Sequence, residues 1–166
     1  MFKWSVVIAT PVLMLAACGD NAETPGDTGE TEATAPAIAT DMESPVDTPF
    51  CYFTAAEADT PLTGPEARYV FVTDTGASVY HGYAKLNGEV TELNEVEAGF
   101  GANMETRRYF SEDKQVELEV LLVDETGGEA AAGDTIPYSG SVRVTYPAEG
   151  EAVKVRGACR AEAEPQ

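Results

Sequence analysis

Alternation between apolar and acidic side chains is the feature that most restricts the fold of this 166-residue chain. It is clearest in residues 115–123, where Glu117 and Glu119 alternate with four apolar residues: Val116, Leu118, Val120 and Leu122. A side-chain period of two places all four apolar groups on one face of an extended chain. The segment therefore predicts a β-strand with one buried face.

Similar strand signals occur on both sides of this segment, between residues 50 and 159. Residues 79–86 and 89–93 flank Asn87-Gly88, which is the strongest two-residue signal for a β-hairpin. The β-rich runs lie at residues 50–54, 68–73, 79–86, 89–93, 104–110, 115–123, 141–146 and 151–159. Short hairpin connections make neighbouring strands antiparallel. The sequence therefore predicts an all-β fold of about eight short strands in a small sandwich or barrel.

Two segments between these runs carry other signals. A turn of helix after Leu93 is an alternative to continued strand, because four apolar residues stand at near-helical spacing: Val90, Leu93, Val96 and Phe100. Residues 124–137 are rich in Gly, Pro and Ala, which predicts a loop.

The first 17 residues have the parts of a secretory signal peptide. Lys3 supplies a positive charge, an apolar run follows from residue 6 to residue 17, and small residues precede Cys18. Leu15-Ala16-Ala17-Cys18 resembles the lipobox of bacterial lipoproteins. The resemblance implies that Cys18 becomes the first mature residue and carries the acyl chains that anchor the protein.

The residue after the lipobox bears on the location. In that family an Asp directly after the Cys tends to retain the protein in the inner membrane, whereas here Gly19 follows Cys18 and Asp20 comes one later. The resemblance therefore implies an outer-membrane anchor facing the periplasm. The mature domain also resembles the small envelope lipoproteins of Gram-negative bacteria.

Two cysteines remain once Cys18 is acylated. Cys51 and Cys159 form an even pair in an oxidising compartment, which predicts a disulfide. Such a bond would clip the first predicted strand to the last.

Residues 18–48 predict a disordered acidic linker. Between residues 19 and 48 the chain has eight acidic residues and no basic one, and Thr, Ala and Pro make up most of the rest. Such a composition buries too little apolar surface to offset the entropy lost on ordering. The folded domain is therefore predicted at residues 49–161, with a frayed tail at 162–166.

Charge and composition exclude several classes of site. The formal net charge of −19 repels phosphate backbones, which disfavours nucleic-acid binding. One His and three Cys cannot form a two-His or a four-Cys metal site. The chain also lacks the Asp-x-Asp-x-Asp-Gly loop of calcium sites. The sequence therefore predicts no metal and no cofactor.

Basic residues gather in and beside the last predicted hairpin: Arg143, Lys154, Arg156 and Arg160. A four-residue turn at 147–150 would place Arg143 opposite Lys154 on the outward face, where like charges repel. Either a neighbouring acidic strand, such as the one with Glu117 and Glu119, or an anionic envelope ligand or partner protein would offset that repulsion.

Asp74-Thr75-Gly76 follows a hydrophobic run and resembles the active-site stretch of aspartic proteases of the retroviral type. The resemblance implies two such Asp residues across a dimer axis that share a proton and activate water. Thr73 and Tyr80 depart from the family pattern. The alternative is a tight turn in which Asp74 accepts backbone hydrogen bonds, and this interpretation makes the domain non-catalytic.

A second resemblance lies just after that motif. Residues 76–80, Gly-Ala-Ser-Val-Tyr, resemble part of the Ser-Gly-Ala-x-Tyr loop of lysozyme inhibitors, which are lipid-anchored, disulfide-clipped β-barrels. We predict a lipid-anchored cell-envelope protein with a non-catalytic β domain that binds a ligand or partner. A structural accessory lipoprotein, a lysozyme-inhibitor-like module and an aspartic-type peptidase are the alternatives.

Overall fold

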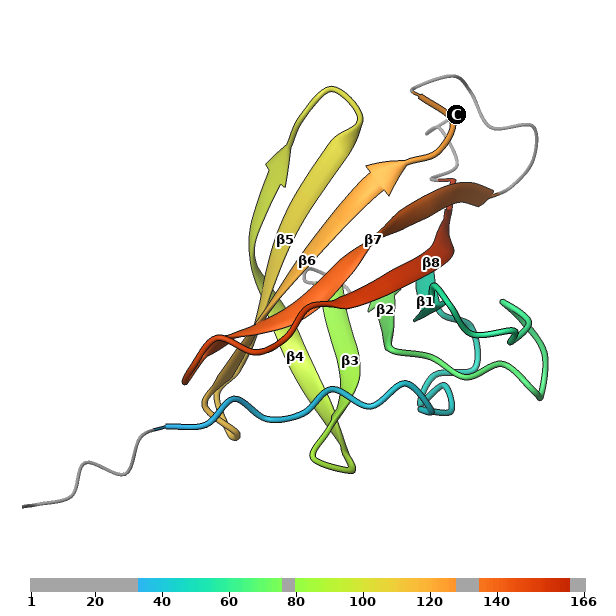
Figure 1. Cartoon of the computed structure of the whole chain (residues 1–166). Coiled ribbons are helices and arrows are strands. Elements are labelled where there is room, and N and C mark those ends of the chain that lie inside the picture. Colours follow the sequence, from blue (N-terminus) through green and yellow to red (C-terminus); the bar gives the residue numbers. More distant parts are fainter. Residues whose placement is uncertain (1–32, 76–79, 128–134, 162–166) are drawn as a thin grey trace, which may run out of the picture. The chain divides into compact units, whose positions relative to one another are not determined.

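The computed structural model describes residues 33–75, 80–127 and 135–161. The predicted signal peptide, Cys18 and the tail at 162–166 lie outside these ranges. The described residues form eight strands: β1 (Cys51–Ala55), β2 (Phe71–Thr75), β3 (Tyr80–Leu86), β4 (Glu89–Phe100), β5 (Met104–Ser111), β6 (Val116–Asp124), β7 (Thr135–Tyr146) and β8 (Val153–Arg160). The strands pair in sequence order, all antiparallel, and β8 pairs with β1 to close a barrel (Figure 1). The predicted all-β fold is confirmed, and its form is a barrel rather than a sandwich.

The seam between the first and last strands closes this barrel. β1 and β8 pair through five residue pairs, from Cys51 opposite Cys159 to Ala55 opposite Val155. The two cysteines are joined by a disulfide across a sequence separation of 108. The predicted bond between the first and last strands is therefore present.

The β3–β4 hairpin has the turn that its sequence predicts. Leu86 and Glu89 form the last cross-strand pair, with Asn87 and Gly88 between them. Both turn residues adopt the left-handed backbone conformation, with φ angles of +49° and +87°. That conformation is what a type I′ turn requires, and Asn and Gly tolerate it best.

Apolar side chains fill the inside of the barrel. The predicted apolar face of β6 belongs to this core: Val116, Leu118, Val120 and Leu122 are each at most 2% exposed. The rings of Phe71 and Tyr109 pack edge to face, 5.0 Å apart, in front of Gly82. A Cβ at Gly82 would lie 2.5 Å from Phe71 Cζ, so the ring pair depends on glycine at that position. Eight strands enclose a space that side chains can fill completely.

The chain before β1 packs against the barrel through residues 35–42, which we call the N-terminal strap. Ala39 donates a backbone hydrogen bond to the carbonyl of Lys85 (2.9 Å). Met42 and Tyr69 exchange backbone hydrogen bonds of 3.1 and 2.8 Å. The Met42 side chain is 1% exposed and belongs to a small second core with Ala67, Tyr69 and Val72.

The strap corrects the predicted domain boundary. Residues 18–48 were expected to be a disordered linker, but the ordered domain extends back beyond Pro49 to the strap. The prediction of disorder was based on the average composition of the segment, in which the isolated apolar residues Ile38 and Met42 have little weight. These two residues form β-bridges to the barrel, Ile38 with Leu86 and Met42 with Tyr69. The rest of the predicted linker, before residue 33, lies outside the described residues.

β4 overturns the alternative of a helical turn after Leu93. The strand continues to Phe100 and contains a register shift between Glu95 and Glu97 opposite β5. Of the four residues at near-helical spacing, only Leu93 is buried; Val90, Val96 and Phe100 are 47%, 58% and 71% exposed. The spacing therefore reflects a β-bulge and an exposed strand end, not a buried helix face.

Two predictions for the second half of the chain are also corrected. β6 reaches Asp124 and β7 begins at Thr135, so strand occupies both ends of the predicted 124–137 loop; residues 128–134 lie outside the described part.

The β7–β8 ladder ends with Val142 opposite Val153, and Ser141 faces Lys154. The predicted four-residue turn and the Arg143–Lys154 pair are wrong, because β7 pairs with β6 alone beyond Val142.

Removing the disulfide should destabilise the barrel without changing its topology. The double variant Cys51→Ala/Cys159→Ala should lose about 4–5 kcal/mol of unfolding free energy, since a bond closing a loop of about 100 residues restricts the unfolded chain by that much. Urea unfolding measures the loss. Reductant should lower the stability of the wild type to a similar value and leave the double variant unchanged. A variant as stable as the oxidised wild type would contradict this account.

Candidate functional site

An arginine lies at one end of the barrel interior. Arg107 of β5 stands opposite Val120 of β6, so its side chain points inward. Its guanidinium lies 2.9 Å from Glu95 Oε1 and 2.8 Å from Glu105 Oε2, and Nε also donates to Glu105 Oε2 at 3.0 Å. The exposed fraction is 20% for the Arg107 side chain, 12% for Glu95 and 22% for Glu105. We call Glu95, Glu105 and Arg107 the mouth cluster.

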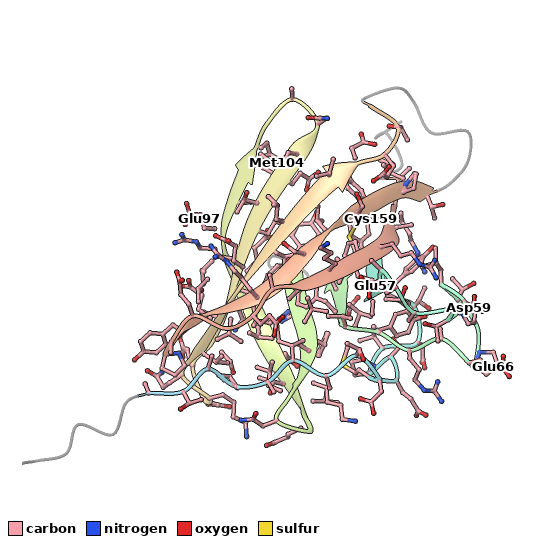
Figure 2. The ribbon with its side chains drawn as sticks, viewed as in Figure 1. Glu57, Asp59, Glu66, Glu97, Met104 and Cys159 are labelled. Atoms are coloured by element: carbon pink, nitrogen blue, oxygen red, sulfur yellow. A yellow bond between two sulfur atoms is a disulfide. The ribbon has the colours of Figure 1, made fainter. Side chains whose placement is uncertain are left out.

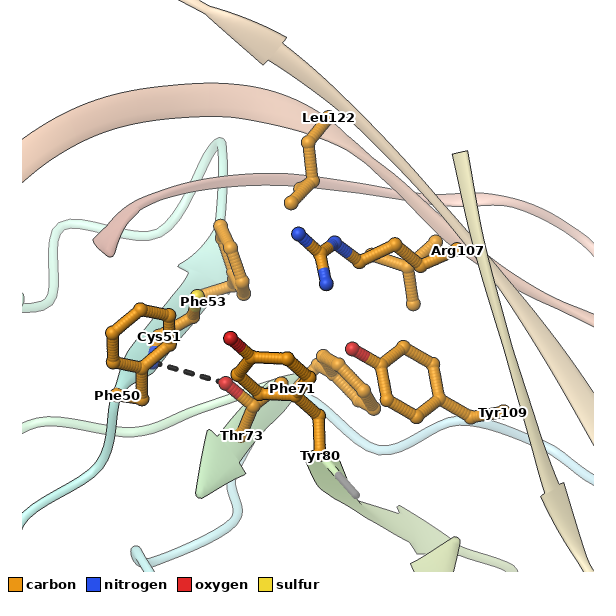
Figure 3. A pocket seen from close by; sticks show the side chains of 10 residues that line it. Phe50, Cys51, Phe53, Phe71, Thr73, Tyr80, Arg107, Tyr109 and Leu122 are labelled. Atoms are coloured by element: carbon orange, nitrogen blue, oxygen red, sulfur yellow. Dashed lines mark hydrogen bonds between the residues drawn. The ribbon is translucent and has the colours of Figure 1, made fainter. Parts of the chain in front are cut away.

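Two aromatic rings contact the same guanidinium. Arg107 Cζ lies 5.5 Å from the ring centroid of Tyr80 on β3 and 5.5 Å from that of Phe100 on β4. Both distances are within the range of a cation–π interaction. Figure 3 shows the Arg107 side chain reaching from β5 across the pocket, above the rings of Tyr80 and Tyr109. Arg107 thus links three strands through charge and ring contacts.

The β-bulge in β4 makes this arrangement possible. Glu95 faces Tyr109, and after the bulge Ala98 faces Arg107 and Phe100 faces Glu105. Without the extra residue, strict alternation from Glu95 would turn Glu97 toward the barrel axis and Phe100 away from it. The bulge therefore brings Phe100 over the guanidinium and leaves Glu97 on the outside.

Two tyrosines complete the surroundings of the cluster. The Tyr138 hydroxyl on β7 donates to Glu105 Oε1 at 3.2 Å. Burial raises the pKa of Tyr138 to about 12, and the negative charge of Glu105 adds to the shift. Burial also raises the pKa of Tyr109, which is 1% exposed. Both hydroxyls are therefore protonated at neutral pH.

The mouth cluster lines an open pocket of about 420 Å³ at this end of the barrel. Its walls include Phe50, Tyr80, Phe100, Ile136, Tyr138 and Arg160. Beneath the cluster, the cavity among Phe53, Phe71 and Tyr109 measures only about 10 Å³, which is about the space of one water molecule. A ligand at this end of the barrel would therefore bind at the mouth and not inside.

The β4–β5 hairpin extends beyond the end of the barrel that holds the mouth pocket. It projects from the end of the barrel opposite the β3–β4 turn and the N-terminal strap (Figure 1). Figure 2 shows Glu97 and Met104 along this hairpin, well apart from Glu57, Asp59 and Glu66 on the β1–β2 connection. Phe100 and Met104 are 71% and 45% exposed.

The four predicted basic residues do not form the expected paired patch. Arg143 stands opposite Glu119 of β6, and its Nη2 lies 2.8 Å from Glu119 Oε1, so the acidic neighbour expected on that strand is present. Arg156 donates to the carbonyls of Ala58 and Thr60 (3.0 and 2.9 Å). Lys154 is exposed on β8, whereas Arg160 lines the mouth pocket. Two of the four side chains are thus committed to contacts within the chain.

Asp74 lies on β2 opposite His81 of β3. His81 Nδ1 lies 3.4 Å from Glu92 Oε1, on the same outer surface. Residues 76–79, which complete both the protease-like and the inhibitor-like motifs, lie outside the described residues. The turn predicted for Asp74 is therefore not tested.

No family model, no curated protein and no solved structure matches this chain. Among residues 33–75, 80–127 and 135–161, no three His, Cys, Asp or Glu side chains come together in a way that could hold a metal ion. Within the same residues, no helix has the length and hydropathy needed to span a membrane.

Sequence reasoning did not find the mouth cluster. Its members come from β4 and β5, and their inward direction depends on the bulge. One local signal was available: Glu105, Arg107 and Tyr109 alternate with Thr106 and Arg108, so a strand over 104–110 must turn either set inward. Because both sets contain an arginine, the alternation alone does not choose between them.

Replacing Arg107 should destabilise the barrel by leaving two carboxylates without their partner. Arg107→Met should lower the unfolding free energy by about 2–4 kcal/mol, because breaking a partly buried ion pair exposes the cost of the remaining charges. Adding Glu95→Gln and Glu105→Gln should restore at least half of the loss. Urea unfolding gives both values. The neighbouring Arg108→Met is the control: its pair with Glu97 is exposed and long (3.5 Å), so it should cost less than about 0.5 kcal/mol. Equal losses for the two arginines would contradict the role of the cluster.

The raised pKa of Tyr138 predicts a loss of stability in alkali. Its folded-state pKa of about 12 exceeds its ordinary value of 10.0, so its contribution is fully present below pH 10 and is lost as the pH rises toward 12. Tyr138→Phe should be less stable than wild type by about 0.5–1.5 kcal/mol below pH 10, because the hydrogen bond to Glu105 is lost. That difference should shrink between pH 10 and pH 12 in urea unfolding. A difference that stays constant across this window would refute the assignment.

Proposed function

We propose that the protein is a lipid-anchored protein of the cell envelope whose barrel is a non-catalytic binding module, with the mouth as its binding end. The observation that carries the proposal is the contrast between a filled interior and an open mouth whose lining groups contact one another. A chamber of about 10 Å³ cannot hold a ligand, whereas the pocket of about 420 Å³ above it is lined by fixed aromatic and charged groups.

The state of the polar groups at the mouth supports binding over catalysis. The Arg107 guanidinium is occupied by Glu95 and Glu105. Tyr138, with a pKa of about 12, is a poor proton acceptor and a poor nucleophile at neutral pH. Groups that already satisfy one another have a fixed geometry, which favours recognition of a surface.

The position of the strap supports an anchored orientation. The strap lies at the end of the barrel opposite the projecting β4–β5 hairpin (Figure 1). The sequence leaves 16 residues between Cys18 and the strap. Lipidation at Cys18, inferred from the lipobox resemblance, would then hold the strap end near the membrane and let the mouth face away from it.

A lysozyme-inhibitor-like module is the second candidate. The closed, disulfide-clipped, eight-stranded barrel agrees with the architecture that the resemblance implies. The inhibitor-like motif ends at Tyr80, whose ring contacts Arg107 at the mouth. Inhibition of lysozyme by the full chain in a cell-wall lysis assay would favour this candidate, and the absence of inhibition would remove it.

Two measurements in the producing cells test the main proposal. Metabolic labelling with palmitate should mark the wild type and not Cys18→Ala, because the acyl chains attach at that residue. A photoreactive phenylalanine analogue should form a discrete protein adduct from position 104 at the mouth and none from position 90 at the far end. These positions are matched controls, since Met104 and Val90 are 45% and 47% exposed. Persistent labelling of Cys18→Ala would disprove the anchor. Absence of an adduct from both positions would favour a structural accessory role.

A further inference from the structure

Exposed apolar side chains concentrate on one hairpin. Of the five large apolar residues that are strongly exposed in the described part of the chain, four lie on β4 and β5. Three of these four lie toward the β4–β5 turn: Val96, Phe100 and Met104. Residues 98–104, which we call the hairpin tip, carry no charge in a chain of net charge −19. Such a stretch on a surface this acidic points to contact with something apolar.

Backbone hydrogen bonds and one ring contact support the hairpin tip. Gly101 donates to the Met104 carbonyl at 2.6 Å, and Asp124 of β6 donates to the Asn103 carbonyl at 2.9 Å. Within the tip, the Phe100 ring contacts the Arg107 guanidinium. An apolar group that is already held by such contacts loses less conformational entropy on docking.

Acidic residues outnumber basic ones around the base of the hairpin tip. Glu97 and Glu105 flank it in sequence and pair with Arg108 and Arg107. Asp124 ends β6 and Glu125 follows it, where Val123 faces Met104, so the four carboxylates and two guanidiniums sum to a charge of −2. The Glu97 side chain is 66% exposed. A partner that receives the tip must therefore approach a negative rim.

We propose that the hairpin tip docks into an apolar recess on a basic protein, with the Phe100 ring as the inserted group. The inference rests on the proposed binding function and names the chemistry of its partner. A net charge of −19 opposes docking of a second copy of the chain. The same rim repels anionic lipid surfaces, and the tip lies at the end opposite the strap that leads toward Cys18. A basic protein satisfies both the apolar knob and the negative rim.

The experiment uses the full, lipidated chain with the photoreactive analogue at position 104, in the producing cells. Three second-site variants are compared: Phe100→Ser, Val90→Ser and Glu97→Lys. Adducts are quantified by immunoblot and identified by mass spectrometry, and circular dichroism confirms that each variant is folded. Crosslinking is repeated on isolated envelopes at low and high salt.

The expected result is an adduct with a protein of net positive charge. Phe100→Ser should lower its yield about tenfold or more, as removal of an aromatic anchor does, whereas the matched Val90→Ser should leave it unchanged. Glu97→Lys and high salt should each lower the yield several-fold, because both weaken charge attraction.

Other adducts from position 104 would overturn the inference in identifiable ways. An adduct with an acidic or neutral protein, or a yield insensitive to Phe100→Ser, would refute the basic partner or the knob while leaving the binding function standing. A dimer adduct would identify a second copy as the occupant, and a lipid adduct would identify the membrane. The lack of any adduct from position 104 would reject the binding function itself.

Discussion

Pairing between β1 and β8 is the constraint on which the rest of the structure depends. These strands lie at opposite ends of the folded chain, and their pairing turns an open sheet with two edges into a closed barrel. The disulfide between Cys51 and Cys159 sits within that seam at the end nearest the mouth. Only a closed barrel brings Phe50, before β1, and Tyr138 of β7 into one pocket with Arg107. The candidate site is therefore a consequence of closure.

The charged cluster at the barrel mouth has a desolvation cost, and it provides directional contacts. An apolar side chain at position 107 would fill the space at lower desolvation cost, since burying charged groups offsets much of their mutual attraction. In return, Arg107 makes directional contacts with Glu95, Glu105 and the two rings, which apolar packing would not fix so narrowly. Those contacts connect the β4–β5 hairpin, including the exposed Phe100, to the barrel mouth.

The strap changes how a lipid anchor would act. A linker that ran freely to residue 48 would let the barrel turn in any direction relative to a membrane. Ala39 and Met42 bond to Lys85 and Tyr69, so residues 35–42 follow one end of the barrel. In the proposed function this geometry separates the anchor from the binding surface.

The sequence by itself determined the elements whose signals are local. Alternation within β6, the Asn87-Gly88 turn and the pairing of the two remaining cysteines each depend on neighbouring residues or on a count, and each is found in the structure. Eight strands in an antiparallel order followed from the same signals. These features need no knowledge of what lies across the barrel.

Tertiary structure alone decided the rest, because it depends on partners distant in sequence. The bulge between Glu95 and Glu97 is defined only opposite β5, and it determines whether Phe100 or Glu97 faces the mouth. The β7–β8 register, which separates Arg143 from Lys154, is likewise set by pairing with β6 and β8 together. In the sequence, Met42 is an isolated apolar residue in an acidic segment. In the structure it packs against Tyr69 and Val72. The sequence gives the type of each apolar or charged residue. Burial and ion pairing depend on two surfaces, and these surfaces come together only in the folded barrel.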